Sequence, residues 1–174
     1  MDVAEAIRTL RAVRRFADRP IDRPALDRIL DAGRRAGSSK NRQERDFVLV
    51  RDRATLGELA RVGPYAGHVA GAAAAVALVV PATPRPAILF DLGLAAQNMV
   101  LAAWAQGVGS CPATVYEPDL ARRLLGYPDD RACPFLLSFG YPADPSDLSR
   151  PPQPGGRRPL RDVVHEETWG RHSL

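Results

Sequence analysis

Apolar residues recur at helical spacing along much of the chain. Val3, Ile7 and Leu10 share one face of the first such stretch, because residues three or four apart lie on the same side of a helix. Asp22 is a residue type that begins helices, and Gly37 stands where a helix-ending glycine is common. The pattern predicts helices over residues 2–13, 24–37, 53–62, about 86–106, 117–127 and 160–169.

Short runs of β-branched and aromatic residues separate these helices. They predict strands over residues 46–51, 76–80, 110–116 and 134–141. The stretch 86–106 is apolar almost all round, which is typical of a helix buried in a core or against another subunit. Because helices and strands alternate only loosely, we expect an α+β, three-layer domain with a mixed central sheet flanked by helices. Proline and glycine are frequent after residue 141, which predicts an extended C-terminal arm over 142–174.

Composition limits the class of protein. With 174 residues, of which 45% are hydrophobic and 25% charged, the chain is long enough for one globular domain over residues 1–174. The formal charge is +4, but basic residues alternate with acidic ones and no basic arm stands out. Nucleic-acid binding therefore has only the overall charge in its favour, and we expect no nucleic-acid partner.

The two cysteines and the hydrophobic runs indicate a cellular location. Cys111 and Cys133 match neither a metal-binding nor a redox spacing, so we expect two buried free thiols in a reducing cytoplasm. The most hydrophobic run, 69–80, is too short to span a bilayer, and no targeting signal is visible. We expect a cytoplasmic protein that does not engage a membrane.

The polar stretch AGSSKNRQERDF, residues 36–47, has two interpretations from its residues alone. Small polar residues are common in surface turns, where their side chains bond to the nearby backbone. The same residues could instead form a loop that grips a ligand, since small residues permit backbone approach and asparagine both donates and accepts hydrogen bonds.

Several motifs in order along the chain resemble the FMN-dependent nitroreductase family. They are RAVRRFADRPI, AGSSKNRQ, DLGLAAQNMVLAAWAQGVGSCP, LLGYP, LLSFGYP and RRPLRDVVHEETW, and they extend over nearly the whole chain. The resemblance implies a homodimer of the domain-swapped kind, with two FMN molecules at the subunit interface. It also implies transfer of two electrons from NADH or NADPH to FMN, and then to an electron-poor acceptor such as a nitroaromatic or a quinone.

The resemblance assigns two arginine-bearing segments to the cofactor. Arg11, Ala12 and Arg14 occupy the positions that bind the phosphate and the pyrimidine edge of the flavin ring, and Arg14 is the candidate near flavin N1 and O2. If residues 2–13 are helical to the end, Arg11 and Arg14 project to one side. Arg157 and Arg158 match the C-terminal arginine that folds back onto the phosphate. The alternative is that these are solvated arginines, or part of an unstructured tail.

Three further segments complete the expected site. Gly37, Ser38, Ser39 and Asn41 form the loop that, in this family, commonly reaches the partner's flavin. The segment GVGSCPAT, residues 107–114, resembles one that in this family presents backbone amides to flavin N5 and O4, and the candidates there are Pro112, Ala113 and Thr114. His68 is a candidate donor to the pyrimidine edge, although a lone histidine before an apolar run is more often structural. No side chain is expected to act as a nucleophile.

The chain departs from the family pattern at several positions. Leu10 and Ala12 stand where the family has an arginine and a serine, and Glu44-Arg45 replaces Pro-Trp after the polar loop. The lost phosphate-binding groups keep a second hypothesis open, in which the protein binds or stores flavin without efficient turnover. Glu44 and Arg45 introduce charge that could alter the choice of acceptor.

Overall fold

The computed structural model describes residues 1–149 and 156–172, and within them one sheet carries the helices. The strands are β1 (Asp46–Val50), β2 (Ala74–Pro81), β3 (Gly109–Thr114) and β4 (Arg131–Gly140). They lie in the order β1-β2-β4-β3, and every pairing between them is antiparallel. The α+β class is confirmed, but the sheet is not mixed: its parallel element is an isolated bridge between Ala12 and Ser110.

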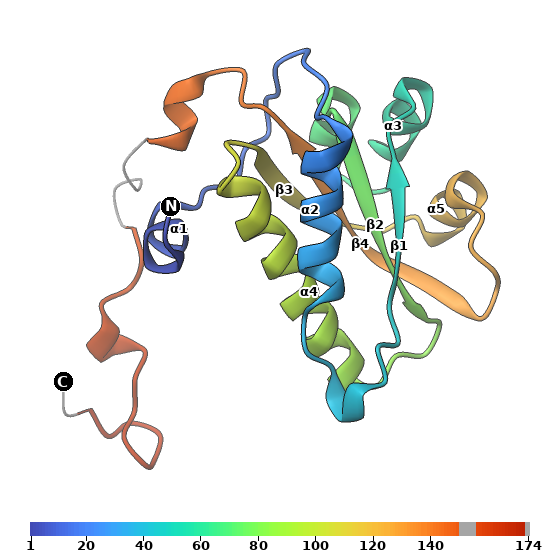
Figure 1. Cartoon of the computed structure of the whole chain (residues 1–174). Coiled ribbons are helices and arrows are strands. Elements are labelled where there is room, and N and C mark those ends of the chain that lie inside the picture. Colours follow the sequence, from blue (N-terminus) through green and yellow to red (C-terminus); the bar gives the residue numbers. More distant parts are fainter. Residues whose placement is uncertain (150–155, 173–174) are drawn as a thin grey trace.

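Helices cover both faces of the sheet, as Figure 1 shows. The helices are α1 (Val3–Thr9), α2 (Arg23–Arg34), α3 (Arg53–Leu59), α4 (Pro86–Trp104) and α5 (Pro118–Leu125). α2 and α4 pack side by side and share one apolar cluster with alternate residues of β2 and β4, including Leu78, Leu137 and Phe139. α3 and α5 pack on the opposite face with the intervening residues, such as Ala77, Ala113 and Leu136. Because successive side chains of a strand point to opposite faces of the sheet, each face has its own apolar core.

Local chemistry explains where several helices begin and end. Asp22 caps α2 by accepting a hydrogen bond from the amide of Ala25, which confirms the predicted start. Asp52 caps α3 in the same way by accepting a hydrogen bond from the amide of Thr55. Gly126 ends α5 in the left-handed region, with φ 71°, where glycine carries no Cβ penalty. The prediction that Gly37 ends the second helix is wrong, since α2 ends at Arg34.

The first helix is shorter than predicted. α1 ends at Thr9, and Leu10 has extended backbone angles (φ −51°, ψ 131°). From there the chain runs beside β3: the amide of Val13 donates to the carbonyl of Ser110 over 2.9 Å. This strand-like contact replaces the helical turn. Arg11 and Arg14 therefore do not share a helix face, and the expected reason for their projecting to one side is wrong.

The C-terminal part of the chain contains less helix than predicted. Residues 160–169 form only a short 3-10 turn, Leu160–Asp162. The ring of His165 stacks on Trp169 with centroids 4.2 Å apart, and Glu167 has a positive φ of 61°, which a continuing helix does not allow. Segment 156–172 extends away from the sheet in Figure 1. Part of the predicted arm, 150–155, lies outside the described residues.

α4 combines a buried side with an exposed apolar one. By length and composition alone it could cross a membrane, but it packs against α2 and the sheet. Its core side includes Leu92 and Met99, whereas Phe90 is 70% exposed and Leu89 and Leu94 are also exposed. Only one side of this largely apolar helix is therefore buried within the described chain.

Candidate functional site

A cavity of about 320 Å³ lies where α4, β3 and the segment after α1 meet. α4 contributes residues at i, i+3, i+4 and i+7, which form one face of the helix. The sheet contributes residues of β3 and β4, and the far C-terminal segment contributes an arginine. The lining comprises Leu10, Arg11, Ala12, Gly93, Ala96, Gln97, Val100, Ser110, Pro112, Leu137 and Arg157. Four residues predicted for the cofactor therefore meet in one hollow: Arg11, Ala12, Pro112 and Arg157.

Arg11 lines this cavity with a guanidinium that is only partly satisfied. One terminal nitrogen donates to the carbonyls of Leu10, over 2.7 Å, and of Arg8, over 3.1 Å. Its Nε is buried and has no hydrogen-bond partner. A buried donor without a partner is costly unless a ligand or water completes it. Arg11 is therefore positioned by the end of α1 and retains donor capacity at the cavity.

The two C-terminal arginines separate. Arg157 lines the cavity although it lies 60 positions beyond the α4 residue Gln97 in the sequence. Arg158 instead donates to the carbonyl of Asp162 over 2.5 Å, across the turn Leu160–Asp162. Of this pair, only Arg157 is available to a ligand in the cavity.

β3 divides the three residues predicted for the flavin amides. Pro112 lines the cavity on the α4 side of the sheet. Ala113 is buried in the opposite core beneath α3 and α5, as expected for the next residue along a strand. Thr114 is exposed and does not line the cavity.

His68 lies on the other face of the same strands. Ser138 Oγ donates to the carbonyl of Cys111 over 3.1 Å, so His68 Nδ1, 2.8 Å from the same hydroxyl, must carry the proton that it donates to Oγ. His68 Nε2 is buried without a partner. Burial, together with the positive charge of Arg14, lowers the pKa of His68, and the nearby Pro112 carbonyl opposes this shift.

Arg14 is exposed and does not line the cavity. It lies instead near His68 and Cys111. Its charge acts on both His68 and Cys111; burial raises the pKa of the Cys111 thiol and Arg14 partly offsets that increase. Cys111 and Cys133 are both buried free thiols, as predicted. The predicted cofactor residues thus divide between two faces of β3 and β4.

The polar loop after α2 does not line the cavity. Lys40, Asn41 and Gln43 all have φ between 53° and 54°, a region that non-glycine residues seldom occupy. The amide of Ser39 donates to Asp91 at the start of α4 over 2.8 Å. The loop is therefore tied to the first half of α4, and Gly37, Ser38, Ser39 and Asn41 are not among the residues that line the cavity.

Glu44 and Arg45, which replace a Pro-Trp pair of the family pattern, have structural partners. Arg45 is 9% exposed and donates to the carbonyls at the end of α2, those of Arg34 and Gly37 over 3.4 Å and that of Ala36. A cation there offsets the partial negative charge of a helix C-terminus. Glu44 pairs with Arg85, which precedes α4, over 2.5 Å. Sequence analysis missed this role, for which no local motif exists.

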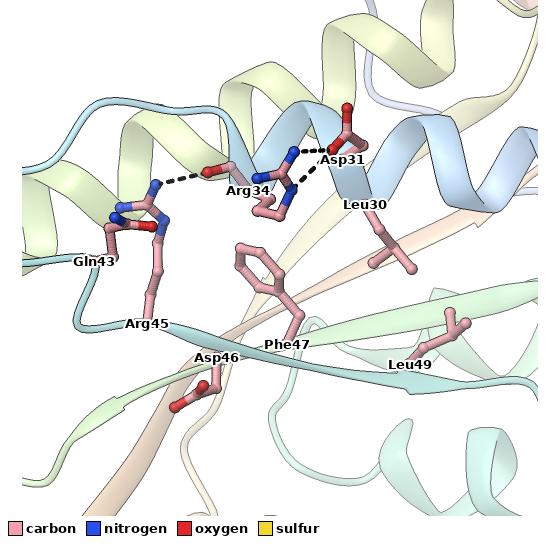
Figure 2. Close-up of a pocket in the computed structure, with 8 residues that line it drawn as sticks. All are labelled: Leu30, Asp31, Arg34, Gln43, Arg45, Asp46, Phe47 and Leu49. Atoms are coloured by element: carbon pink, nitrogen blue, oxygen red, sulfur yellow. Dashed lines mark hydrogen bonds and ion pairs between the residues drawn. The ribbon is translucent and has the colours of Figure 1, made fainter. Parts of the chain in front are cut away.

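A larger cavity, about 460 Å³, lies between α2 and the edge strand β1 (Figure 2). Phe47, Leu49 and Leu30 form its apolar part, and in Figure 2 Phe47 points toward α2. Arg34 pairs with Asp31 over 2.6 Å on the helix above. Because β1 is the last strand of the described sheet, its outer backbone groups are unpaired there, which suits an extended peptide better than a flavin.

Comparison with known proteins identifies the family. The model of the Nitroreductase family matches residues 7–70 and 58–141. This chain belongs to the Nitroreductase family. A protein of Methanothermobacter thermautotrophicus, provisionally named an NADH dehydrogenase/NAD(P)H nitroreductase, is 32% identical over 97% of this chain and 88% of its own length. The NADPH-flavin oxidoreductase of Vibrio harveyi is 29% identical over 98% of this chain and 75% of its own.

A solved structure agrees with this nitroreductase assignment. The NADPH:FMN oxidoreductase of Vibrio harveyi, determined in complex with NAD⁺, has a TM-score of 0.83 at 27% identity, over 98% of this chain and 79% of that one. The family resemblance inferred from the motifs is thereby confirmed, as is the nitroreductase-like fold.

Proposed function

We propose that this protein is an FMN-dependent oxidoreductase, which transfers electrons from NADH or NADPH through the flavin to a small electron-poor acceptor such as a nitroaromatic or quinone. The observation that carries the proposal is the convergence of Arg11 and Arg157 on a cavity whose other walls are mostly apolar. Relatives named as NADPH-flavin oxidoreductases support the same chemistry. Purified protein should be yellow.

The lining fits the chemical groups of FMN. A phosphate needs charged or backbone donors, and the guanidinium of Arg11 has a buried Nε without a partner. A flat ring needs apolar walls and close backbone approach, which Val100, Leu137 and the small residues Gly93 and Ala96 offer. When bound, FMN would accept a hydride from the nicotinamide and return two electrons to the acceptor.

This chain's own residues then have binding and electrostatic roles. Arg11 and Arg157 would hold the phosphate, and the apolar wall would exclude water from the ring. Arg14 would supply positive charge near the edge of β3, which favours the reduced, anionic cofactor. Ala12 and Pro112 would contact the cofactor through backbone and ring atoms. Ala113 and His68 would act from the opposite face of the sheet by shaping β3, and Thr114, two residues after Pro112 on the same face, would act from beside the cavity.

A homodimer is part of the proposal. Exposed apolar residues on α4, Leu89, Phe90 and Leu94, have no cover within the described chain. The loop with Gly37, Ser38, Ser39 and Asn41 would then reach the cofactor held by the other copy. The C-terminal segment, with Leu160 and Val163 exposed, would lie in the partner's cavity beside β1. Light scattering should give about twice the chain mass of 18.9 kDa.

One experiment separates the proposal from its main rival. Protein saturated with FMN is mixed anaerobically with NADH or NADPH while the flavin absorbance is followed. Bleaching by either nicotinamide, followed by recovery when a quinone is added, would support the oxidoreductase. Steady-state rates should then give the parallel reciprocal plots of a ping-pong reaction, because both substrates use one flavin. Retained flavin that neither nicotinamide bleaches would favour a flavin-binding module without turnover. A protein that takes up no FMN would refute both.

We also propose a cytoplasmic location. Fractionation of the source cells, followed by detection of the protein in the soluble or the membrane fraction, would test it.

A further inference from the structure

A third hollow, separate from the cavity assigned to FMN, is surrounded by arginines. It measures about 310 Å³ and is lined by Asp18, Arg19, Pro20, Arg51, Arg53 and Ala73. The three guanidinium-bearing residues come from different segments: the connector before α2, the end of β1 and the first turn of α3. One carboxylate, Asp18, accompanies them, so the lining carries a surplus of two positive charges.

Two of the arginines, Arg19 and Arg53, are oriented by contacts with neighbouring groups. The guanidinium carbon of Arg19 lies 3.9 Å from the centroid of the Tyr141 ring, and stacking of this kind uses the face of the group. One terminal nitrogen of Arg53 donates to the carbonyl of Ala72 over 3.2 Å. Such anchoring lowers the entropy that an arginine loses when it binds an anion.

The third arginine has no partner of its own. The side chain of Arg51 is exposed and makes no hydrogen bond or ion pair within residues 1–149 and 156–172. Its neighbour Asp52 does not neutralise it, because that carboxylate accepts hydrogen bonds from the amide and hydroxyl of Thr55, each over 2.8 Å. These bonds lower the pKa of Asp52 and commit it to the cap of α3.

The existing ion pair in the hollow is weakly held. Asp18 pairs with Arg53, but the side chain of Asp18 is 93% exposed and that of Arg53 is 56% exposed. Pairs this exposed are screened by water and salt and contribute little. An anion that bridges several guanidinium groups can therefore displace Asp18 at small cost.

We propose that this hollow is a binding site for a phosphate-type oxyanion, either free or carried on a nucleotide. Planar guanidinium forks match the oxygens of phosphate in pairs, and three of them suit a multivalent anion better than a single carboxylate. The site is distinct from the proposed flavin cavity. Ala73 and Ser110 contact Phe139 from opposite sides of β4, so they lie two strand spacings apart, about 10 Å. No lining residue is shared.

Calorimetric titration with inorganic pyrophosphate tests the site, using FMN-saturated protein at constant ionic strength. Arg51→Gln should weaken pyrophosphate binding about tenfold, the value of one charge-assisted hydrogen bond. The matched control, Arg123→Gln, removes an exposed arginine on α5 and should leave the affinity unchanged. Equal weakening by both variants would overturn the proposal, because it would indicate a general charge effect.

Removal of the competing carboxylate provides a test of opposite sign. Asp18→Asn should strengthen pyrophosphate binding several-fold, whereas Glu117→Gln, which removes an exposed carboxylate elsewhere, should not. No gain from Asp18→Asn, or release of FMN by pyrophosphate, would contradict a separate site. If the protein takes up no FMN, the proposed function fails, but the comparison of Arg51 with Arg123 still decides whether this hollow binds the anion.

Competition identifies the source of the phosphate group. If NADP⁺ displaces pyrophosphate and NAD⁺ does not, the site takes the additional phosphate of the nucleotide. If neither nucleotide competes, its ligand is a free oxyanion. Both results require that Arg51→Gln weakens pyrophosphate binding.

Discussion

The two faces of β3 and β4 differ in how completely they are filled. On the α4 side, Arg11 and Arg157 line a hollow of about 320 Å³, and one guanidinium nitrogen lacks a partner. On the α3 side, His68, Ser138 and the carbonyl of Cys111 form a chain of hydrogen bonds against a packed core, although His68 Nε2 is itself buried without a partner. Each face thus has one unpartnered nitrogen, and the difference is the hollow with two arginines, which leads us to expect a ligand on the first face and a structural role for the second.

Adjacent leucines on β4 test this contrast most strongly. Leu136 is buried in the packed core, whereas Leu137 lines the hollow. Each Leu→Ala variant should lower the free energy of unfolding within the range of about 2–5 kcal/mol, with the larger loss for Leu136→Ala. The reason is that Leu137 already borders empty space and loses fewer contacts. Urea denaturation measures both losses, and a larger loss at Leu137 would remove the contrast.

Adjacent arginines test the hollow as a cofactor site. Arg157→Gln should raise the dissociation constant of FMN about 10- to 100-fold, because one charge-assisted hydrogen bond to phosphate is lost. Arg158→Gln is the matched control: Arg158 bonds to the carbonyl of Asp162 and does not line the cavity. Quenching of flavin fluorescence on titration gives both constants. Equal effects would mean that the C-terminal segment binds FMN in another arrangement.

Ser138 tests whether the second face is structural. Ser138→Ala removes the hydroxyl between His68 and the Cys111 carbonyl and leaves both buried groups with one bond fewer. We expect a loss of about 1–2 kcal/mol in the free energy of unfolding and an unchanged FMN affinity. Ser149→Ala, at an exposed serine, is the control and should change neither. A large loss of FMN affinity in Ser138→Ala would instead make this face part of the cofactor site.

The smallest effect concerns the dependence of stability on pH. The pKa of His68 is lowered in the folded protein below its ordinary value of 6.5 by burial and by Arg14. The unfolded chain therefore binds more protons just below pH 6.5, and stability should fall as the pH decreases from 6.5 toward the folded pKa, then level off. Denaturation at several pH values should show this slope in the native protein and a smaller slope in His68→Asn. Identical slopes would show that His68 does not contribute.

Much of the secondary structure could be predicted because its causes are local. The apolar spacing of α2 and α5, the aspartate caps at Asp22 and Asp52, and the β-branched run of β2 all act within a few residues. The family motifs also act at this level, since each is a short pattern. They identified the family and its fold.

Tertiary contacts decided what these local signals could not. Residues 10–13 have helical composition, but pairing with Ser110 draws them beside β3, so Arg11 reaches the cavity while Arg14 faces His68. Tertiary contacts likewise bring Arg45 to the carbonyl of Ala36 after α2, and Arg157 to the cavity beside α4. The spacing along the chain determined which residues could form helices and strands. Which guanidinium groups share a hollow depended on segments distant in sequence that only the folded sheet brings together.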